Sequence, residues 1–187
     1  MAKVTGLTVR YGKNTVLNNF SANFPTGSVT AVSGRSGCGK TTLLSVISGL
    51  LRPAHGSLEG FGTCSMLFQE DRLLPFLKAV KNLTVTTGCT ENEAQTALKQ
   101  VGFLDEDYEK IASALSGGMA RRVAIVRAML AKSDTLILDE PFKGLDDKTR
   151  AEVLEFVNAN RSGRTTIVVT HDPRDAGDLN ASHFIQM

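Results

Sequence analysis

Residues 34–41 combine the residue types that bind the phosphates of a nucleotide. They match the spacing G-x-x-x-x-G-K-[ST] and read Gly34, Arg35, Ser36, Gly37, Cys38, Gly39, Lys40 and Thr41. Glycines let the backbone curl so that several N–H groups point inward at phosphate oxygens. We expect Lys40 to reach the β- and γ-phosphates and the Thr41 hydroxyl to bind Mg²⁺. The pattern predicts a nucleotide site made of these residues and the adjoining Thr42.

Two adjacent carboxylates follow an apolar run later in the chain. Residues 136–138 read Leu-Ile-Leu and lead directly to Asp139 and Glu140. Such a run is typical of a central strand in a parallel sheet, and ligands bind at the carboxyl edge of such sheets. We therefore expect Asp139 to hold Mg²⁺ between the β- and γ-phosphates. We expect Glu140 to orient or deprotonate the attacking water.

The elements that must position these residues alternate between strand and helix patterns. Residues 28–33 predict a strand ahead of the glycine-rich loop, and a helix follows it as far as the break at residues 49–53. Further strands are expected at residues 63–68, 134–140 and 165–170. Residues 1–30 predict antiparallel strands, with runs at 4–11 and 16–24 and a turn at 12–14. This order is typical of an α/β domain with a mainly parallel central sheet and an N-terminal antiparallel β subdomain.

A helical insertion is expected between the strands. Residues 72–115 have helical character, and Thr90 is a plausible N-cap ahead of Glu91 and Glu93. A further helix opens with two glycines at 117 and 118, and an amphipathic helix is expected at residues 146–160. We expect one domain over residues 1–187, with a short helical subdomain at about 72–118 inserted in its core.

Composition and charge narrow the class of protein. The net charge of +2 gives no reason to expect a partner such as nucleic acid, which is bound through bulk positive charge. Cys38, Cys64 and Cys89 are odd in number and form no CxxC pair, which indicates reduced thiols rather than disulfides or a zinc site. The N-terminus has no signal-peptide core, and no stretch reaches the length of a membrane span. We expect a cytoplasmic chain unless a partner holds it at a membrane.

The phosphate loop, the acidic strand end and residues 115–118, which read Leu-Ser-Gly-Gly, together resemble the ABC ATPase family. LSGG is the signature motif of that family. Four further segments follow the family's order: Tyr11, Gln69, residues 141–146 ending at an aspartate, and His171. The resemblance covers almost the whole chain and implies a P-loop NTPase fold. Met119 stands where many members of the family have glutamine.

The resemblance implies a role for each of these residues. Tyr11 would stack on the adenine of ATP, Gln69 would serve in catalysis and in Mg²⁺ binding, and His171 would contact the γ-phosphate. Ser116, Gly117 and Gly118 would bind the γ-phosphate of ATP held by a second subunit. A helix N-terminus offers N–H donors and a positive dipole for this purpose. Two chains would then enclose two ATP molecules head to tail in a homodimer with two-fold symmetry.

The function favoured by this resemblance is that of a peripheral ATPase on the cytoplasmic face of the membrane, bound to integral membrane permease subunits. The segments MLFQEDRLLPFL, LSGGM and DEPFKGLD are most similar to importer ATPases of the nitrate, sulfonate and taurine type. Two alternatives stay open, namely a soluble ABC ATPase of DNA repair or translation and a regulatory module that does not hydrolyse ATP. The absence of large insertions or a second cassette disfavours the first, and the presence of Glu140 and His171 disfavours the second. The short stretch after His171 predicts no regulatory C-terminal domain.

Overall fold

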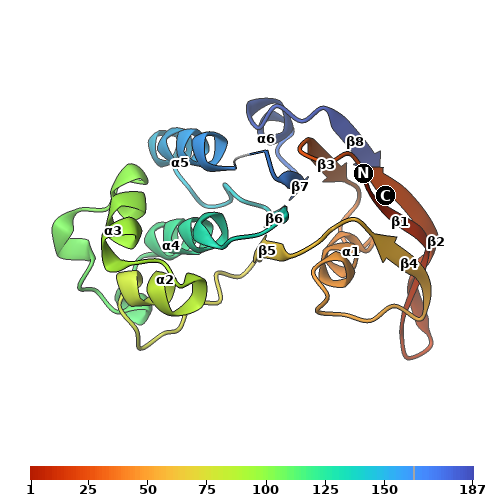
Figure 1. Cartoon of the computed structure of the whole chain (residues 1–187), viewed down its shortest axis with the longest axis horizontal. Coiled ribbons are helices and arrows are strands. Elements are labelled where there is room, and N and C mark those ends of the chain that lie inside the picture. The colour runs from red at the N-terminus through yellow and green to blue at the C-terminus, as the bar shows by residue number, and fades with distance from the viewer. Residues whose placement is uncertain (162) are drawn as a thin grey trace. The chain divides into compact units, whose positions relative to one another are not determined.

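Segments far apart in the sequence build two units. The computed structural model describes residues 1–161 and 163–187 (Figure 1). The first unit contains residues 1–66, 133–140 and 163–187, and the second contains residues 67–132 and 141–161.

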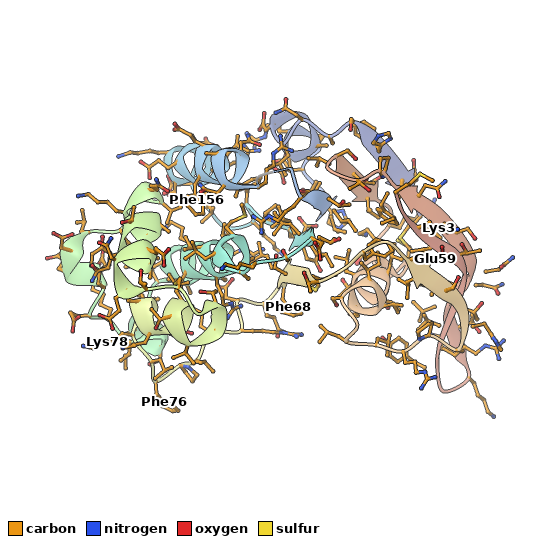
Figure 2. The ribbon with its side chains drawn as sticks, in the orientation of Figure 1. Lys3, Glu59, Phe68, Phe76, Lys78 and Phe156 are labelled. Carbon is orange, nitrogen blue, oxygen red and sulfur yellow. The ribbon has the colours of Figure 1, made fainter. Side chains whose placement is uncertain are left out.

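An antiparallel sheet of order β2-β1-β4 opens the first unit. Strands β1 (Ala2–Tyr11) and β2 (Asn14–Phe24) form the predicted hairpin. The other edge of β1 pairs with β4 (His55–Glu59), where Lys3 and Glu59 form an ion pair of 3.1 Å across the two strands (Figure 2). Strand β4 was not predicted, because four of its five residues are exposed and it lacks an apolar pattern.

A five-stranded sheet of order β5-β6-β7-β3-β8 carries the predicted apolar strands. In chain order the strands are β3 (Val29–Ser33), β5 (Cys64–Leu67), β6 (Thr135–Asp139), β7 (Thr165–Val169) and β8 (His183–Gln186). The neighbours β6, β7, β3 and β8 are parallel. Every residue of β6 and β7 is buried, as expected for central strands that are covered on both faces. Strand β8 was missed because it is short and mostly exposed.

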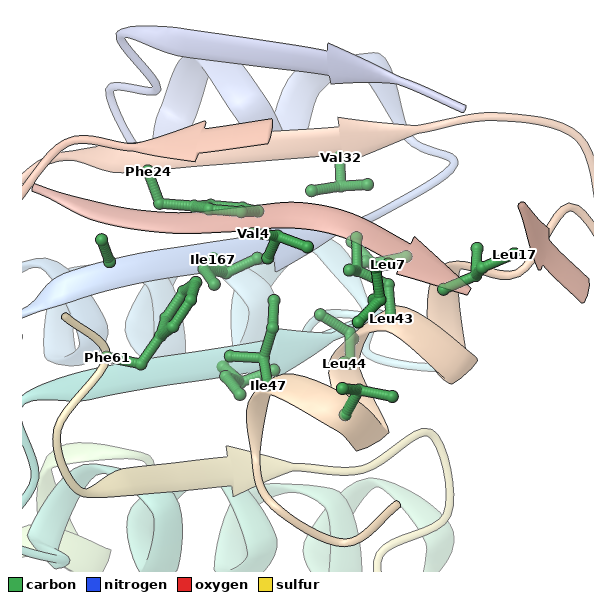
Figure 3. Packing of buried hydrophobic residues seen from close by; sticks show 14 of the residues in the cluster. Val4, Leu7, Leu17, Phe24, Val32, Leu43, Leu44, Ile47, Phe61 and Ile167 are labelled. Carbon is green, nitrogen blue, oxygen red and sulfur yellow. The ribbon is translucent and has the colours of Figure 1, made fainter. Parts of the chain in front are cut away.

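The core of the first unit lies between β1, helix α1 (Lys40–Ile47) and the five-stranded sheet (Figure 3). Val4 and Leu7 of β1 pack there with Leu43 and Ile47 of α1 and Ile167 of β7. Each such side chain stabilises the fold by about 1.5–3 kcal/mol relative to its exposed state. The packing therefore fixes α1, and with it the loop that precedes α1, on the sheet.

Four helices form the second unit, and α4 (Gly117–Leu130) contacts the other three. They are α2 (Ala79–Thr87), α3 (Glu91–Gln100) and α5 (Asp147–Asn160). Short 3-10 turns lie at Asp105–Asp107 and Ala112–Ala114. Thr90 caps α3 in a capping box with Glu93, which confirms the predicted N-cap. Over residues 1–161 and 163–187, no helix has both the length and the apolar character that a membrane crossing requires.

Candidate functional site

Three neighbouring parallel strands of the first unit end at the same edge. Val169 of β7 lies in register with Val32 of β3 on one side and with Asp139 of β6 on the other. Residues that follow these positions therefore leave the sheet side by side. They are the glycine-rich loop after β3, Glu140 after β6 and His171 shortly after β7.

The backbone of the loop between β3 and α1 requires glycine at two closely packed positions. A Cβ atom on Gly34 would lie 2.7 Å from the carbonyl oxygen of Met187, and one on Gly39 would lie 2.7 Å from Leu17 Cδ2. Gly39 is also the N-cap of α1 and has φ 105°, a left-handed value that suits glycine. At Gly37 a Cβ atom would meet nothing within 4 Å. The loop is thus packed on the protein side and open at its turn, as a phosphate cradle must be.

Lys40 places a nearly buried ammonium group inside this loop. Its residue is 7% exposed, and its Nζ donates hydrogen bonds to the carbonyl oxygens of Gly34 at 2.8 Å and Arg35 at 3.0 Å. The loop continues through the exposed Ser36 to Cys38, whose N–H donates to Arg35 O at 3.2 Å. A buried cation in a curled, glycine-rich backbone fits an anionic ligand such as phosphate.

Thr41 and Asp139 bring two oxygen ligands together. The Thr41 hydroxyl donates to Asp139 Oδ2 at 3.4 Å, and Asp139 is 2% exposed. Hydroxyl and carboxylate oxygens are the ligands that Mg²⁺ prefers. In the described part of the chain, no group of three or more His, Cys, Asp or Glu residues is placed to hold a metal ion. Thr42 follows in α1 and is half-buried.

Glu140 and His171 form a second pair at the same edge. Glu140 Oε1 lies 3.4 Å from His171 Nε2, and the His171 N–H donates to Glu140 Oε2 at 3.4 Å. The backbone N–H of Glu140 donates to Val169 O at 2.8 Å, and its φ of 51° is left-handed. The Glu140 side chain is 13% exposed and that of His171 is 58% exposed. The arrangement thus places a nearly buried carboxylate beside an accessible imidazole.

Further hydrogen bonds, not predicted from the sequence, stabilise the turn around His171. Thr170 Oγ1 donates to Asp175 Oδ2 at 2.5 Å and accepts from the Asp172 N–H at 3.0 Å. Asp172 then caps α6 (Pro173–Asp178). The signal was present, since aspartate followed by proline is a typical helix start.

Tyr11 lies at the end of β1, beside the hairpin turn, and is 53% exposed. It pairs with Asn14 across the hairpin. An exposed aromatic ring on a rigid hairpin can stack on a base.

The second unit holds the remaining predicted residues. Ser116 caps α4, where its Oγ accepts from the Met119 N–H at 3.3 Å. Ser116 and Gly117 are exposed, and a Cβ atom on Gly117 would meet nothing within 4 Å. A Cβ atom on Gly118 would come no closer than 3.9 Å to any side chain. The start of this helix is therefore open to an anion.

Gln69 and Asp146 lie at other points of the second unit. Gln69 has an exposed side chain, and its carbonyl oxygen accepts from Arg121 Nη1 at 3.4 Å. Asp146 caps α5, and hydrogen bonds from the N–H and hydroxyl of Thr149 hold the pKa of its carboxyl below the ordinary value. The structure thus gathers residues 34–42, Asp139, Glu140 and His171 at one sheet edge. The positions of Gln69 and residues 116–118 are defined within the second unit.

Comparison with known proteins gives a consistent result. The family model for ABC transporters matches residues 17–143. The chain is 40% identical over 182 residues to the aliphatic sulfonates import ATP-binding protein SsuB 1 of Rhodococcus jostii, which covers 92% of this chain and 74% of the relative. It is 38% identical to SsuB of Burkholderia ambifaria, with 92% of this chain but 57% of the relative covered.

Solved structures show the same similarity. A dimeric structure of a bacterial ABC transporter cassette matches with a TM-score of 0.86 at 25% identity, covering 100% of this chain and 94% of the other. A dimeric post-hydrolysis state of an ATP-binding cassette, bound to ADP and Pi, matches with a TM-score of 0.87 at 25% identity and the same coverage.

Proposed function

Because the chain belongs to the ABC transporter family and is one of its ATP-hydrolysing subunits, we propose that it powers import of a small solute through a separate membrane permease. The relatives named above are import ATP-binding proteins for aliphatic sulfonates, which supports this direction and this size of substrate. The observation that supports ATP hydrolysis is the sheet edge where Asp139 ends β6 and where Lys40, Thr41, Glu140 and His171 follow adjacent strands.

The proposed ATP binding rests on the glycine-rich loop between β3 and α1. Residues 34–42 would surround the phosphates, with the Lys40 ammonium exchanging its carbonyl partners for β- and γ-phosphate oxygens. Tyr11 would stack on the adenine. Thr41 and Asp139 would hold Mg²⁺, which neutralises charge on the phosphates when bound.

ATP hydrolysis would use Glu140 and His171. Glu140 would orient the attacking water and accept its proton, since its nearly buried carboxylate lies beside His171 at the sheet edge. His171 would bind the γ-phosphate with its exposed imidazole, and Gln69 is a further proposed catalytic residue.

Two copies of the chain would complete each site. The similar solved cassettes are dimeric. We propose a head-to-tail homodimer around two ATP molecules, in which Ser116, Gly117 and Gly118 at the start of α4 bind the γ-phosphate of ATP on the partner subunit. Residues 1–187 would act as one ABC ATPase domain with a helical subdomain at about 72–118.

The import proposal is tested by identifying the proteins that bind this chain. The tagged chain, which we propose lies on the cytoplasmic face, should co-purify from detergent-solubilised membranes with polytopic permease subunits. Vesicles that contain this complex should hydrolyse ATP in step with solute uptake, and the Glu140→Gln variant should lose both. Recovery with a DNA-repair or translation assembly, and without permease subunits, would replace the import proposal by the soluble alternative.

A further inference from the structure

A single buried guanidinium in the second unit joins two segments that border proposed catalytic residues. Arg121 lies on α4 and is 4% exposed. Its Nη1 donates to Phe68 O at 2.8 Å and to Gln69 O at 3.4 Å, and its Nε donates to Pro141 O at 3.2 Å. Arg121 therefore bridges the backbone that carries Gln69 and the first residue after Glu140.

We propose, on the basis of the function given above, that Arg121 is a positioning residue for ATP hydrolysis. Its hydrogen bonds hold the backbone of Gln69 in position relative to Pro141, the residue that follows Glu140 in the chain. Gln69 has an exposed side chain, so its direction depends on how its backbone is held. Arg121 itself acts through these neighbours and not through contact with ATP.

The chemistry of the contact requires arginine. A guanidinium is planar and presents its donors in a fixed fork, so one side chain can serve acceptors on two segments at once. The charge is balanced by Asp71, whose Oδ1 lies 3.0 Å from Nη1. A lysine could keep the pair with Asp71, but its single ammonium cannot hold Phe68 O and Pro141 O in the same geometry.

Arg127 supplies a matched control on the same helix. Its Nη1 donates to Arg72 O and its Nη2 to Asp71 O, both at 2.7 Å. It fastens the same loop two to three residues beyond Gln69. Loss of Arg127 should therefore cost stability as loss of Arg121 does, without moving Gln69 and Pro141 relative to each other.

The experiment compares Arg121→Gln, Arg121→Lys and Arg127→Gln in the full chain. The ATPase kcat and KM, the ATP dissociation constant and the midpoint of thermal unfolding are measured for each. We expect kcat to fall about 10- to 100-fold in Arg121→Gln, since displacement of a positioned group by about 1 Å has an effect of this size. KM and ATP affinity should stay within about two-fold, because phosphate binding belongs to the loop. Arg127→Gln should keep kcat within about two-fold at a similar loss of thermal stability.

A double-mutant cycle tests the route of the effect. If Arg121 acts through Gln69, adding Arg121→Gln to Gln69→Ala should lower kcat by less than it does in the wild type. The effects of Arg127→Gln and Gln69→Ala on kcat should instead multiply, as expected for independent residues. Arg121→Lys, which keeps the charge and favours folding, should show the same fall in kcat as Arg121→Gln to within about three-fold.

Equal loss of kcat in Arg121→Gln and Arg127→Gln, in proportion to their loss of stability, would overturn the inference and leave Arg121 a structural residue. So would multiplicative effects of Arg121→Gln and Gln69→Ala. The Glu140→Gln variant is run alongside as a separate arm. Wild-type turnover in Glu140→Gln would contradict the proposed hydrolytic roles, whereas its inactivity beside a fully active Arg121→Gln would contradict the positioning role alone.

Discussion

The imidazole of His171 meets the carboxylate of Glu140, with Nε2 and Oε1 3.4 Å apart, at the ends of two adjacent parallel strands. The Glu140 side chain is only 13% exposed, whereas the histidine side chain is 58% exposed and open to a ligand. A base placed in this way is suited to orient one water molecule against a bound phosphate.

The first prediction concerns Glu140→Gln. The amide keeps the shape of the side chain but cannot accept a proton, so ATP should bind and remain intact. Intact γ-phosphate keeps both subunits bound to a shared ligand, which favours the dimer by mass action. Size-exclusion chromatography with ATP at low Mg²⁺ should therefore show a dimer, and the same run with ADP a monomer. Identical monomer peaks in both runs would contradict the composite site.

Lys40→Ala should abolish most of the ATP affinity. Loss of charge-assisted hydrogen bonds to two phosphates corresponds to roughly 3 kcal/mol, or about 100-fold in the dissociation constant. Isothermal titration with ATP measures the change. Lys99→Ala, on the exposed side of α3, is the matched control and should bind as the wild type does. Unchanged affinity in Lys40→Ala would rule out the loop as the phosphate site.

Alkylation should act through Cys38. Its half-buried thiol lies in the phosphate loop, with Sγ 3.9 Å from Lys40 Nζ, so a bulky adduct would occupy the space for phosphate. Burial raises the pKa of the Cys64 thiol, and the Asp134 carboxylate raises it further, which disfavours the reactive thiolate there. Maleimide treatment should block ATPase activity, and ATP should protect. A Cys38→Ala variant that is inhibited equally would assign the effect to another thiol.

The cap of α3 can be tested by stability alone. Thr90→Ala removes the side-chain acceptor for the Glu93 N–H and should lower the free energy of unfolding by about 1 kcal/mol. Thr96→Ala, an exposed site within the same helix, should be neutral or slightly stabilising, because alanine has the higher helix propensity. Urea titration followed by circular dichroism measures both, and equal effects would mean that the cap contributes nothing.

Acid should weaken the fold through Asp107. Hydrogen bonds from the Lys110 ammonium and from the Leu104 N–H hold the pKa of this carboxyl below its ordinary value. A depressed pKa in the folded state stabilises the protein above the unfolded pKa of about 3.9, and this contribution is lost as the pH falls through the folded pKa. The stability gap between wild type and Asp107→Asn should therefore be constant near pH 7 and shrink below about pH 4. A gap that does not change with pH would contradict the assignment.

Local patterns were sufficient to predict much of the fold. The strands β3, β6 and β7 follow from short apolar runs, and the start of α1 follows from the glycine-rich spacing before Lys40. The strand register aligns Val32, Asp139 and Val169, so the residues that follow these positions lie at one edge of the sheet. The roles assigned to the residues there stay predictions until they are tested.

Other features depend on contacts that no local pattern contains. Strands β4 and β8 are mostly exposed edge strands, so they lack a buried face to mark them in the sequence. The sequence does not distinguish Arg121 from Arg122 and Arg127 of the same helix. The acceptors of Arg121 lie 50 to 53 residues before it and 20 residues after it in the chain, so only the folded backbone reveals the bridge.

The left-handed backbone of Glu140 means that this position opposes folding while it serves chemistry. A φ of 51° is strained for a residue with a side chain, by about 1–2 kcal/mol, and the following proline narrows the alternatives further. Glycine would relieve the strain and remove the carboxylate at the same time. Selection for thermostability alone would thus favour an inactive variant. A screen for more thermostable variants of this protein should therefore also measure ATP turnover.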